Sequence, residues 1–320
     1  MHRERFDHVV LGAGLRGLAA ALAHRRERPE ASLLVIDAAP HAGGSVRTQR
    51  SNGFVCELGP FAFARGEIAP LLAALDRPPP LVEPLPEGRR GWRFDGGAPT
   101  EGAGDPLPVS FASGTEELPQ ACRRELGAAL RLGRTAAALR PTAAGWEIEL
   151  GGEAATCIDA ARVTLALPAT ASARLLGAFD RELPNVAARV GAEPRAFVFV
   201  GGHGGAWREL RGHGVLPTEA VDTPVAELLF CTQVFARRAL SGRTLVRAEV
   251  AAADAGDAAL VPLVLATLQA WTGVGLAAPS SNVAFSKVHR FAVDADPGAA
   301  VELQTRLGAV AARCTGLALA

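Results

Sequence analysis

The chain has 320 residues, enough for one large domain or two ordinary ones. Its 33 Lys and Arg residues balance 33 Asp and Glu residues, so the formal net charge is zero and no basic footprint for nucleic acid is present. Five cysteines are scattered without a C-x-x-C pair, which argues against a disulfide framework and a zinc site. We therefore expect reduced thiols and no metal.

The N-terminal region is typical of a nucleotide-binding unit. A short apolar strand at residues 8–11 runs into a glycine-rich turn, and a helical pattern follows at residues 15–26. In this strand–turn–helix context, Gly12 permits a tight turn, Gly14 allows backbone N–H groups to approach a pyrophosphate, and Gly17 allows close packing of helix and strand. The phosphates would lie at the helix N-terminus. The cofactor contacts predicted in this turn are Gly12, Ala13, Gly14, Leu15 and Gly17.

The residues that follow the turn indicate which cofactor is bound. Asp37 ends a second predicted strand, residues 33–36, and lies where a carboxylate accepts hydrogen bonds from a ribose 2′-OH and repels a 2′-phosphate. Beyond it, Gly43 and Gly44 allow close backbone approach to a ligand, and Arg47 offers a planar fork suited to phosphate. A second phosphate-facing element so close to the first predicts an extended dinucleotide, which favours FAD over NADP.

These motifs together resemble the flavin-containing amine oxidase superfamily, which shares the glycine turn, the acidic strand end and the GG-x-x-R-T motif. Within it, GFVCELGPFAF at residues 53–63 is similar to the Glu-x-Gly-Pro segment of protoporphyrinogen oxidases. The resemblance implies an FAD-dependent oxidoreductase that oxidises a porphyrinogen to a porphyrin, as in haem biosynthesis. In such an enzyme the cofactor carries the hard chemical step, so the catalytic residues stay unknown.

Later motifs of the same family imply further contacts. Arg90 occupies the position of the arginine that meets a substrate propionate, with a solvated hairpin arginine as the alternative. Predicted strands at residues 131–150 resemble the segment whose backbone holds the adenine, with the contact near Ala136. Leu216 and Leu229 fall where the family places apolar side chains against the tetrapyrrole plane, and core packing is the alternative for both.

The expected fold class is α/β, with an FAD-binding Rossmann-like domain of the glutathione-reductase type and a mixed, β-rich substrate domain. The FAD-binding domain is predicted to be discontinuous and to comprise residues 1–75, 114–176 and 300–320. The substrate domain would take residues 76–113 and 177–299. Consecutive strands that feed helices imply a parallel sheet, in which the strand at Val9 lies beside the strand at Val35. Thr115 is the expected N-cap of the helix that follows it.

The chain ends in a predicted strand at residues 316–320, where the resembled family continues into a glycine-led loop and a helix that faces the flavin. The family also carries a longer helical part of the substrate domain between residues 108 and 114. We therefore expect a shortened member that binds FAD loosely and oxidises porphyrinogen poorly. Two alternatives stay open: a non-catalytic flavin-fold protein, and another branch such as a carotenoid desaturase or an amine oxidase.

One uncharged segment, residues 258–286, is a candidate membrane span, but only residues 261–271 predict a continuous helix, which is too short to cross a bilayer. A buried helix and loop is therefore expected. The charged start of the chain leads directly into the first strand and leaves no room for a signal peptide. We expect a cytoplasmic protein with a porphyrinogen-like small-molecule substrate and no nucleic-acid partner. Peripheral contact with the inner membrane and the oligomeric state stay open.

Overall fold

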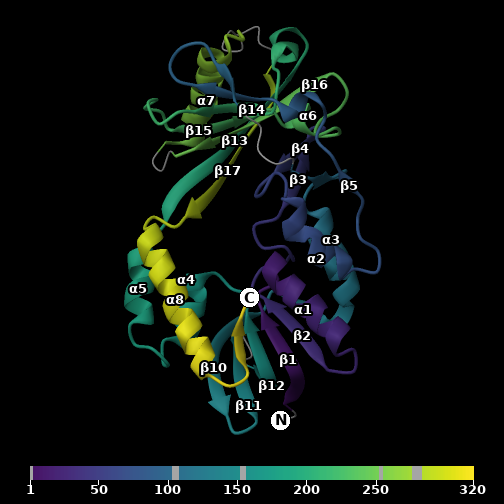
Figure 1. Cartoon of the computed structure of the whole chain (residues 1–320), viewed down its shortest axis with the longest axis vertical. Coiled ribbons are helices and arrows are strands. Elements are labelled where there is room, and N and C mark those ends of the chain that lie inside the picture. Colours follow the sequence, from purple (N-terminus) through teal and green to yellow (C-terminus); the bar gives the residue numbers. More distant parts are fainter. Residues whose placement is uncertain (1–2, 103–107, 152–155, 252–254, 276–282) are drawn as a thin grey trace.

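The computed structural model describes residues 3–102, 108–151, 156–251, 255–275 and 283–320. Figure 1 shows two β-sheets at opposite ends of an elongated molecule, joined by segments on either side of its middle. Each sheet takes strands from distant parts of the sequence, so neither half of the molecule is one continuous stretch of chain.

The first sheet has a parallel core made of apolar, β-branched runs. β1 lies between β12 and β2 and is parallel to both, with Val10 directly opposite Val35. This confirms the predicted central position of the first strand. β9 extends the parallel part beyond β2, and β18 pairs with the carboxyl end of β12. β10 and β11 add an antiparallel extension to the amino-terminal half of β12. The strands are β1 (Glu4–Leu11), β2 (Leu33–Asp37), β9 (Leu130–Leu132), β10 (Thr135–Thr142), β11 (Gly145–Gly151), β12 (Thr156–Leu165) and β18 (Leu317–Leu319).

Helices cover both faces of the first sheet, so β1 is buried on both sides and is almost wholly apolar at its carboxyl end. Val10 belongs to the core under α1, α2 and α3, whereas Val9 and Leu11 belong to the core under α4, α5 and α8. This alternation follows from the two-residue period of a strand. The helices are α1 (Leu15–Glu27), α2 (Arg65–Ala73), α3 (Glu117–Leu126), α4 (Ala169–Leu176), α5 (Leu183–Val190) and α8 (Pro297–Arg313).

The second sheet is mainly antiparallel, in the order β17-β13-β16-β15-β14-β6-β7. α7 covers one face with Leu260, Val264, Leu268 and Trp271, a spacing that puts all four on one side of the helix. The helix expected near residues 261–271 is therefore confirmed, although it is buried along one face only, and the loop expected after it extends into residues 276–282, which lie outside the described ranges. No helix in the described ranges is long and apolar enough to cross a membrane. The elements are β6 (Gly91–Phe94), β7 (Thr100–Gly102), β13 (Glu193–His203), β14 (Gly214–Pro217), β15 (Val225–Leu229), β16 (Arg243–Val250), α7 (Asp257–Thr272) and β17 (Val283–Val293).

A hairpin from the N-terminal region packs on the other face of the second sheet. Phe54 on this hairpin stacks on Phe285, with ring centroids 4.9 Å apart. Its ring also occupies the space where any side chain at Gly201 would lie, because a Cβ there would come within 2.7 Å of the ring. The two halves of the molecule are thus packed together through an aromatic core. The smaller elements in this region are β3 (Thr48–Ser51), β4 (Phe54–Glu57), β5 (Leu81–Val82), β8 (Ser110–Phe111) and α6 (Cys231–Val234).

The expected fold class is confirmed: a Rossmann-like α/β half is joined to a β-rich second half. The proposed domain boundaries stay a prediction. The position of α5 does not agree with the boundary placed after residue 176. This helix falls within the range 177–299 assigned to the second domain, but Leu183, Val186 and Val190 are buried in the core of the first sheet. The expected N-cap at Thr115 is wrong, because α3 is preceded by Glu116 at the cap position.

Candidate functional site

The glycine turn lies at the carboxyl end of β1, and its three glycines differ in what the fold requires of them. Gly12 has φ +108°, and a Cβ at Gly17 would lie 1.9 Å from the Gly12 carbonyl oxygen. Both positions therefore need glycine for the protein's own backbone. Gly14 has an ordinary φ of −67°, and a Cβ there would meet nothing within 4 Å. The space in front of Gly14 is open at the N-terminus of α1, where backbone N–H groups favour an anion.

The second predicted phosphate-facing segment lies directly against the first. The backbone N–H of Gly43 donates to the carbonyl of Ala13 over 2.8 Å, and Gly14 and Gly43 form a parallel bridge. Gly43 and Gly44 have φ values of +112° and +60°, in the left-handed region that favours glycine. The tertiary structure thus brings together two loops that the sequence singled out separately.

Asp37 stands at the end of β2 beside the same loops. Its carboxylate accepts hydrogen bonds from the backbone N–H groups of Ala13 at 2.6 Å and Ala39 at 2.7 Å. A carboxylate has about four lone-pair sites, so two remain for a ribose hydroxyl. Asp37 therefore shapes the glycine turn in addition to facing any ligand bound there.

A cavity of about 250 Å³ opens beside Asp37 and the glycine turn. Ala136, the predicted adenine contact, is one of its lining residues, next to a register irregularity in β10 between Ala136 and Ala138. The walls combine apolar side chains from β1, β2 and α4 with two arginines, Arg134 and Arg174. A flat nucleobase such as adenine, apolar on its faces and polar at its edge, fits such a space. The other lining residues are Leu11, Ile36, Ala38, Thr135, Ala137, Leu167, Ala171 and Leu175.

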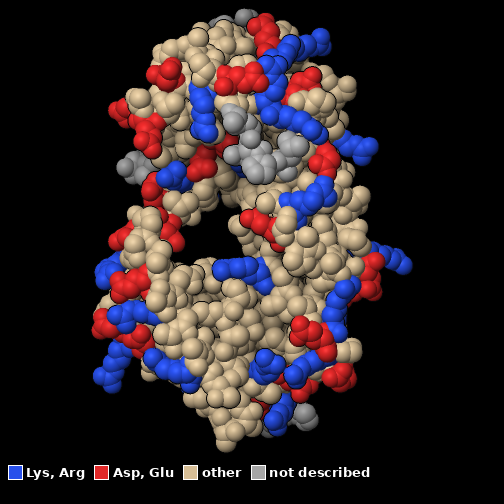
Figure 2. Space-filling view, in the orientation of Figure 1, with Lys and Arg blue, Asp and Glu red and all other residues tan. Residues whose placement is uncertain are grey.

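Arg47 is not among the residues that line this cavity, and it lies close enough to the second sheet for its charge to act on His289. Its guanidinium is exposed, and within the described ranges it has no hydrogen bond or ion pair. Burial lowers the pKa of His289 on β17, and the nearby charges of Arg47 and Lys287 lower it further. The segment from Gly43 to Arg47 therefore leads from the nucleotide loops to the space between the two halves, which Figure 2 shows as a hollow through the middle of the molecule.

The second sheet meets the N-terminal region through Arg247 on β16. Its guanidinium lies 4.2 Å from the ring centroid of Phe197 and donates a 2.8 Å hydrogen bond to the carbonyl of Gly59. Glu227 on β15 lies 3.9 Å from the same guanidinium. Burial raises the pKa of Glu227, the Arg247 charge opposes that rise, and Glu249 adds to it. The face of the second sheet that carries Arg247 thus presents an aromatic ring and paired charges to the N-terminal segment at Gly59.

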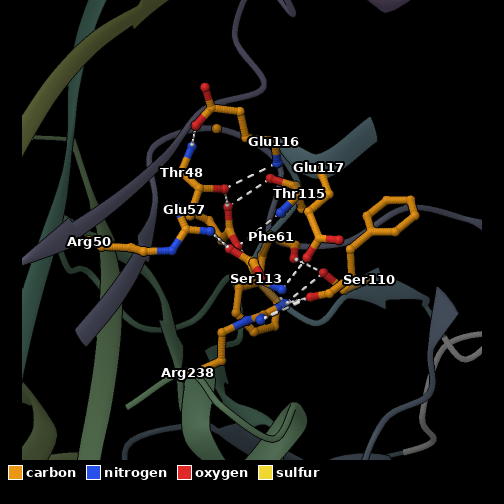
Figure 3. Close-up of polar contacts among 12 residues, drawn as sticks. Thr48, Arg50, Glu57, Phe61, Ser110, Ser113, Thr115, Glu116, Glu117 and Arg238 are labelled. Carbon is orange, nitrogen blue, oxygen red and sulfur yellow. Dashed lines mark hydrogen bonds and ion pairs between the residues drawn. The ribbon is translucent and has the colours of Figure 1, made fainter. Parts of the chain in front are cut away.

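A buried polar network holds the hairpin in place (Figure 3), and the sequence interpretation missed it. The Glu57 carboxylate accepts hydrogen bonds from the hydroxyls of Thr48 and Thr115, each at 2.7 Å, and from the Thr115 backbone N–H at 3.1 Å. Arg238 lies 3.9 Å from Glu57 and donates to the Ser110 hydroxyl at 2.7 Å. Burial raises the pKa of Glu57, and Arg238 and these donors oppose that rise. The available signal was a charged residue, Glu57, at the end of an otherwise apolar strand.

The predicted substrate residues lie on or beside three neighbouring strands of the second sheet, β15, β14 and β6. Leu216 on β14 and Leu229 on β15 share the face of Arg247, because Gly214 lies opposite Leu229 and Leu229 lies opposite Arg247. Arg90 instead precedes β6, five strand positions from β17, or about 24 Å across the sheet. It is exposed and makes a bidentate ion pair with Glu101. Arg90 lies beside β14, because its backbone carbonyl accepts a 2.7 Å hydrogen bond from the His213 N–H and Leu216 lies opposite Arg93 of β6. Leu229 is buried in the aromatic core, which agrees with core packing for this residue.

The thiols and other metal-binding side chains offer no alternative site in the described residues. All five cysteines are free, and burial raises the pKa of Cys56, Cys122 and Cys231 to about 12. No cluster of three or more His, Cys, Asp or Glu side chains suited to a metal ion occurs within those ranges. These thiols are packing residues, since a buried thiol with a raised pKa is a poor nucleophile.

Comparison with known proteins agrees with this architecture. Residues 10–77 match the family described as NAD(P)-binding Rossmann-like domain. Coproporphyrinogen III oxidase of Bacillus subtilis (strain 168) is 36% identical over 69 residues, a match that spans 20% of this chain and 15% of that protein. This curated relative is therefore similar to the chain over a small part of its own length.

Solved structures are similar over the whole chain. A candidate protoporphyrinogen oxidase from Exiguobacterium sp. 255-15 superposes with a TM-score of 0.79 at 17% identity, over 100% of this chain and 94% of that one. A UDP-galactopyranose mutase superposes with a TM-score of 0.74 at 13% identity, over 98% and 89% of the two chains. That the chain is shortened thus stays a prediction. By its fold, the protein is a two-domain α/β protein with a Rossmann-like nucleotide-binding domain and a β-rich second domain, the architecture it shares with these structures.

Proposed function

We propose that the protein is an FAD-dependent oxidoreductase. When bound, FAD supplies the redox step by accepting a hydride equivalent from a C–H bond. The residues of this chain would hold it, with the pyrophosphate at Gly14 and Gly43, the ribose at Asp37 and the adenine beside Ala136. Arg47 would face the far end of the cofactor. These residues would bind and orient FAD and exclude water from it.

The observation that carries this proposal is the open space at Gly14. At Gly14, φ is ordinary and no protein atom lies within 4 Å of the missing Cβ, so the fold itself does not require glycine there, and the N-terminus of α1 is open to a ligand. The paired loops of Gly14 and Gly43 border that space, and the cavity at Ala136 opens beside it. An extended dinucleotide is the ligand that needs all three features at once.

For the substrate, we propose a porphyrinogen. The supports are the local similarity to a coproporphyrinogen III oxidase, the fold similarity to a candidate protoporphyrinogen oxidase, and the apolar side chains of Leu216 and Leu229 on the inner face of the second sheet. Fold similarity alone does not determine a reaction, because the same architecture occurs in a sugar-nucleotide mutase. The substrate assignment therefore needs its own test.

A second candidate function, binding of NADP, has one observation in its favour. Arg134 and Arg174 line the cavity beside Asp37, and arginines can pair with a 2′-phosphate. Asp37 opposes that reading, because its carboxylate lies at the strand end where the ribose hydroxyl is bound and repels a second anion.

The test compares the two dinucleotides directly. We expect the purified protein, after reconstitution and gel filtration, to show flavin absorbance, and we expect calorimetry to give tighter binding for FAD than for NADPH. Tighter binding of NADPH would overturn the FAD assignment. The same flavin-to-protein ratio measures the predicted loose binding. Conversion of coproporphyrinogen III or protoporphyrinogen IX to the fluorescent porphyrin then tests the substrate, and a flavin-loaded protein that oxidises neither would remove the porphyrinogen assignment.

A further inference from the structure

Lys287 is the only lysine among the 33 basic residues of the chain. It lies within β17, and its side chain is half-buried. Lysine carries a compact point charge on a flexible stem, whereas arginine carries a planar fork that favours bidentate pairing. Because arginine occupies every other basic position, the chain has a single side-chain ammonium, and it lies in the second sheet.

The register of β17 determines which way Lys287 points. Lys287, His289 and Phe291 alternate along one face, opposite Phe199, Phe197 and Arg195 of β13. The same face packs Phe285 against the hairpin of β4, and the ring centroids of Phe197 and Phe291 lie 4.3 Å apart. Val288 and Arg290 occupy the opposite face, where Val288 packs on the α7 core and Arg290 pairs with Asp257. Lys287 therefore points toward the middle of the molecule, the side on which Arg47 lies.

The carboxylates on this face already have basic partners. Arg195 pairs with Glu193 at 2.8 Å and Glu249 at 3.2 Å, and Arg247 lies 3.9 Å from Glu227. Lys287 and Arg47 are left without an ion pair in the described ranges, although both charges act on the same imidazole, that of His289. Two uncompensated positive charges, one of them half-buried, make a site of positive potential that an anion would stabilise.

We propose that Lys287, with Arg47 facing it from the nucleotide domain, binds a carboxylate substituent of the substrate, whose ring lies against the partly buried Phe291. The inference rests on the proposed function, because it assumes that the substrate enters the space between the two halves. The substrate class is then an apolar macrocycle that bears carboxylate side chains, as a porphyrinogen does. The inference also moves the expected carboxylate contact from Arg90, at the far side of the second sheet, to β17.

Because Lys287 is the only lysine, an amine-specific reagent reports on it directly. We would acetylate the full chain with sulfo-N-hydroxysuccinimidyl acetate and follow Lys287 by peptide mass spectrometry, with the α-amino group as internal control. Coproporphyrin III, a tetracarboxylate, should slow acetylation of Lys287 by at least about tenfold, as expected for a charge-assisted contact. The tetramethyl ester of coproporphyrin III, tested in the same micellar buffer as the acid, should not slow acetylation of Lys287. Equal protection by acid and ester, or none by either, would overturn the proposal, and so would equal protection by inorganic phosphate.

Matched variants separate this inference from the proposed function. Lys287→Met removes the charge but keeps the stem, and Arg290→Met makes the same change on the opposite face of the same strand. Coproporphyrin III binding, measured by fluorescence quenching, should weaken about ten- to a hundredfold in Lys287→Met and less than about twofold in Arg290→Met. Lys287→Arg, which keeps the charge, should recover part of the loss.

Flavin content is measured in the same samples. Unchanged coproporphyrin III affinity in Lys287→Met, with normal flavin content, would contradict this inference without contradicting the proposed function. A wild-type protein that takes up no FAD would sink the proposed function, while the acetylation experiment would still decide whether Lys287 binds carboxylates. A melting temperature for Lys287→Met equal to that of Arg290→Met shows that a loss of binding is not a loss of fold.

Discussion

Gly43 donates its backbone N–H to the carbonyl of Ala13, and this single 2.8 Å bond aligns two loops that are separated in sequence by a helix and a strand. Between them lies the open space in front of Gly14. The bond therefore makes one binding surface from two motifs, and the first prediction concerns that surface.

Gly14→Val should abolish flavin retention without unfolding the protein. The added side chain would occupy space that no protein atom uses, so the fold should tolerate it while a pyrophosphate should not. Gly308→Val on α8 is the control, because that glycine is also exposed, and a Cβ there would also meet nothing within 4 Å. The measurement is the flavin-to-protein ratio after gel filtration, together with the melting temperature. Normal flavin content in Gly14→Val would refute the proposed phosphate position.

Arg90→Ala should change the KM for porphyrinogen by less than about twofold, because the carboxylate contact is proposed at Lys287 and the Arg90 guanidinium already pairs with Glu101. A propionate contact at Arg90 would instead raise the KM by roughly ten- to a hundredfold in Arg90→Ala, and Glu101→Gln would then lower it by freeing the guanidinium. Arg140→Ala is the matched control, because Arg140 is also an exposed arginine paired with a glutamate, at 2.8 Å from Glu149 in the first sheet. An unchanged KM in Arg90→Ala would make Arg90 a surface residue and would agree with its distance from β17.

Glu57→Gln should lower the free energy of unfolding by about 3 kcal/mol, because it leaves the Arg238 charge buried without its counter-charge. The double variant Glu57→Gln with Arg238→Met should recover part of that loss, since no unpaired charge remains. The exposed pair of Arg131 and Glu4 is the control, and Glu4→Gln should cost less than about 1 kcal/mol. Urea unfolding measures these three variants and Arg238→Met alone, and additive effects in the double variant would contradict coupling of the pair.

His8 should make the protein less stable in mild acid. Burial, the charge of His24 and that of Arg162 lower the pKa of His8 from 6.5 to about 4. The folded state therefore holds His8 neutral, while the unfolded state takes up a proton as the pH falls below 6.5. His8 therefore costs no stability above pH 6.5. As the pH falls from 6.5 toward 4, the free energy of unfolding decreases progressively by about 3 kcal/mol.

Urea unfolding of the wild type and of His8→Val between pH 7 and pH 4 tests this expectation. His8→Val should remove most of the pH dependence attributed to this site. Thr164→Val removes the hydroxyl that lies 2.9 Å from His8 Nε2 without removing the titrating group, so it should keep the slope. A slope that is the same in His8→Val and in the wild type would assign the acid sensitivity to other groups.

The sequence by itself determined the nucleotide loops. Gly12, Gly17 and Asp37 lie in one strand–turn–helix–strand unit, where short-range backbone geometry permits few solutions. The apolar strand of β1 and the helix of α7 were recognisable for the same reason, because each carries its own periodicity.

Only the tertiary structure decided the contacts between distant segments. Thr115 was expected to cap α3, but its hydroxyl satisfies the buried Glu57 carboxylate instead, because an unpaired buried charge costs more than an uncapped helix. Arg247 reaches Gly59 across 188 positions of sequence, and Lys287 comes to face the side of Arg47 through the register of β17 with β13. No local pattern encodes these pairings, because they depend on how the two sheets pack against one hairpin.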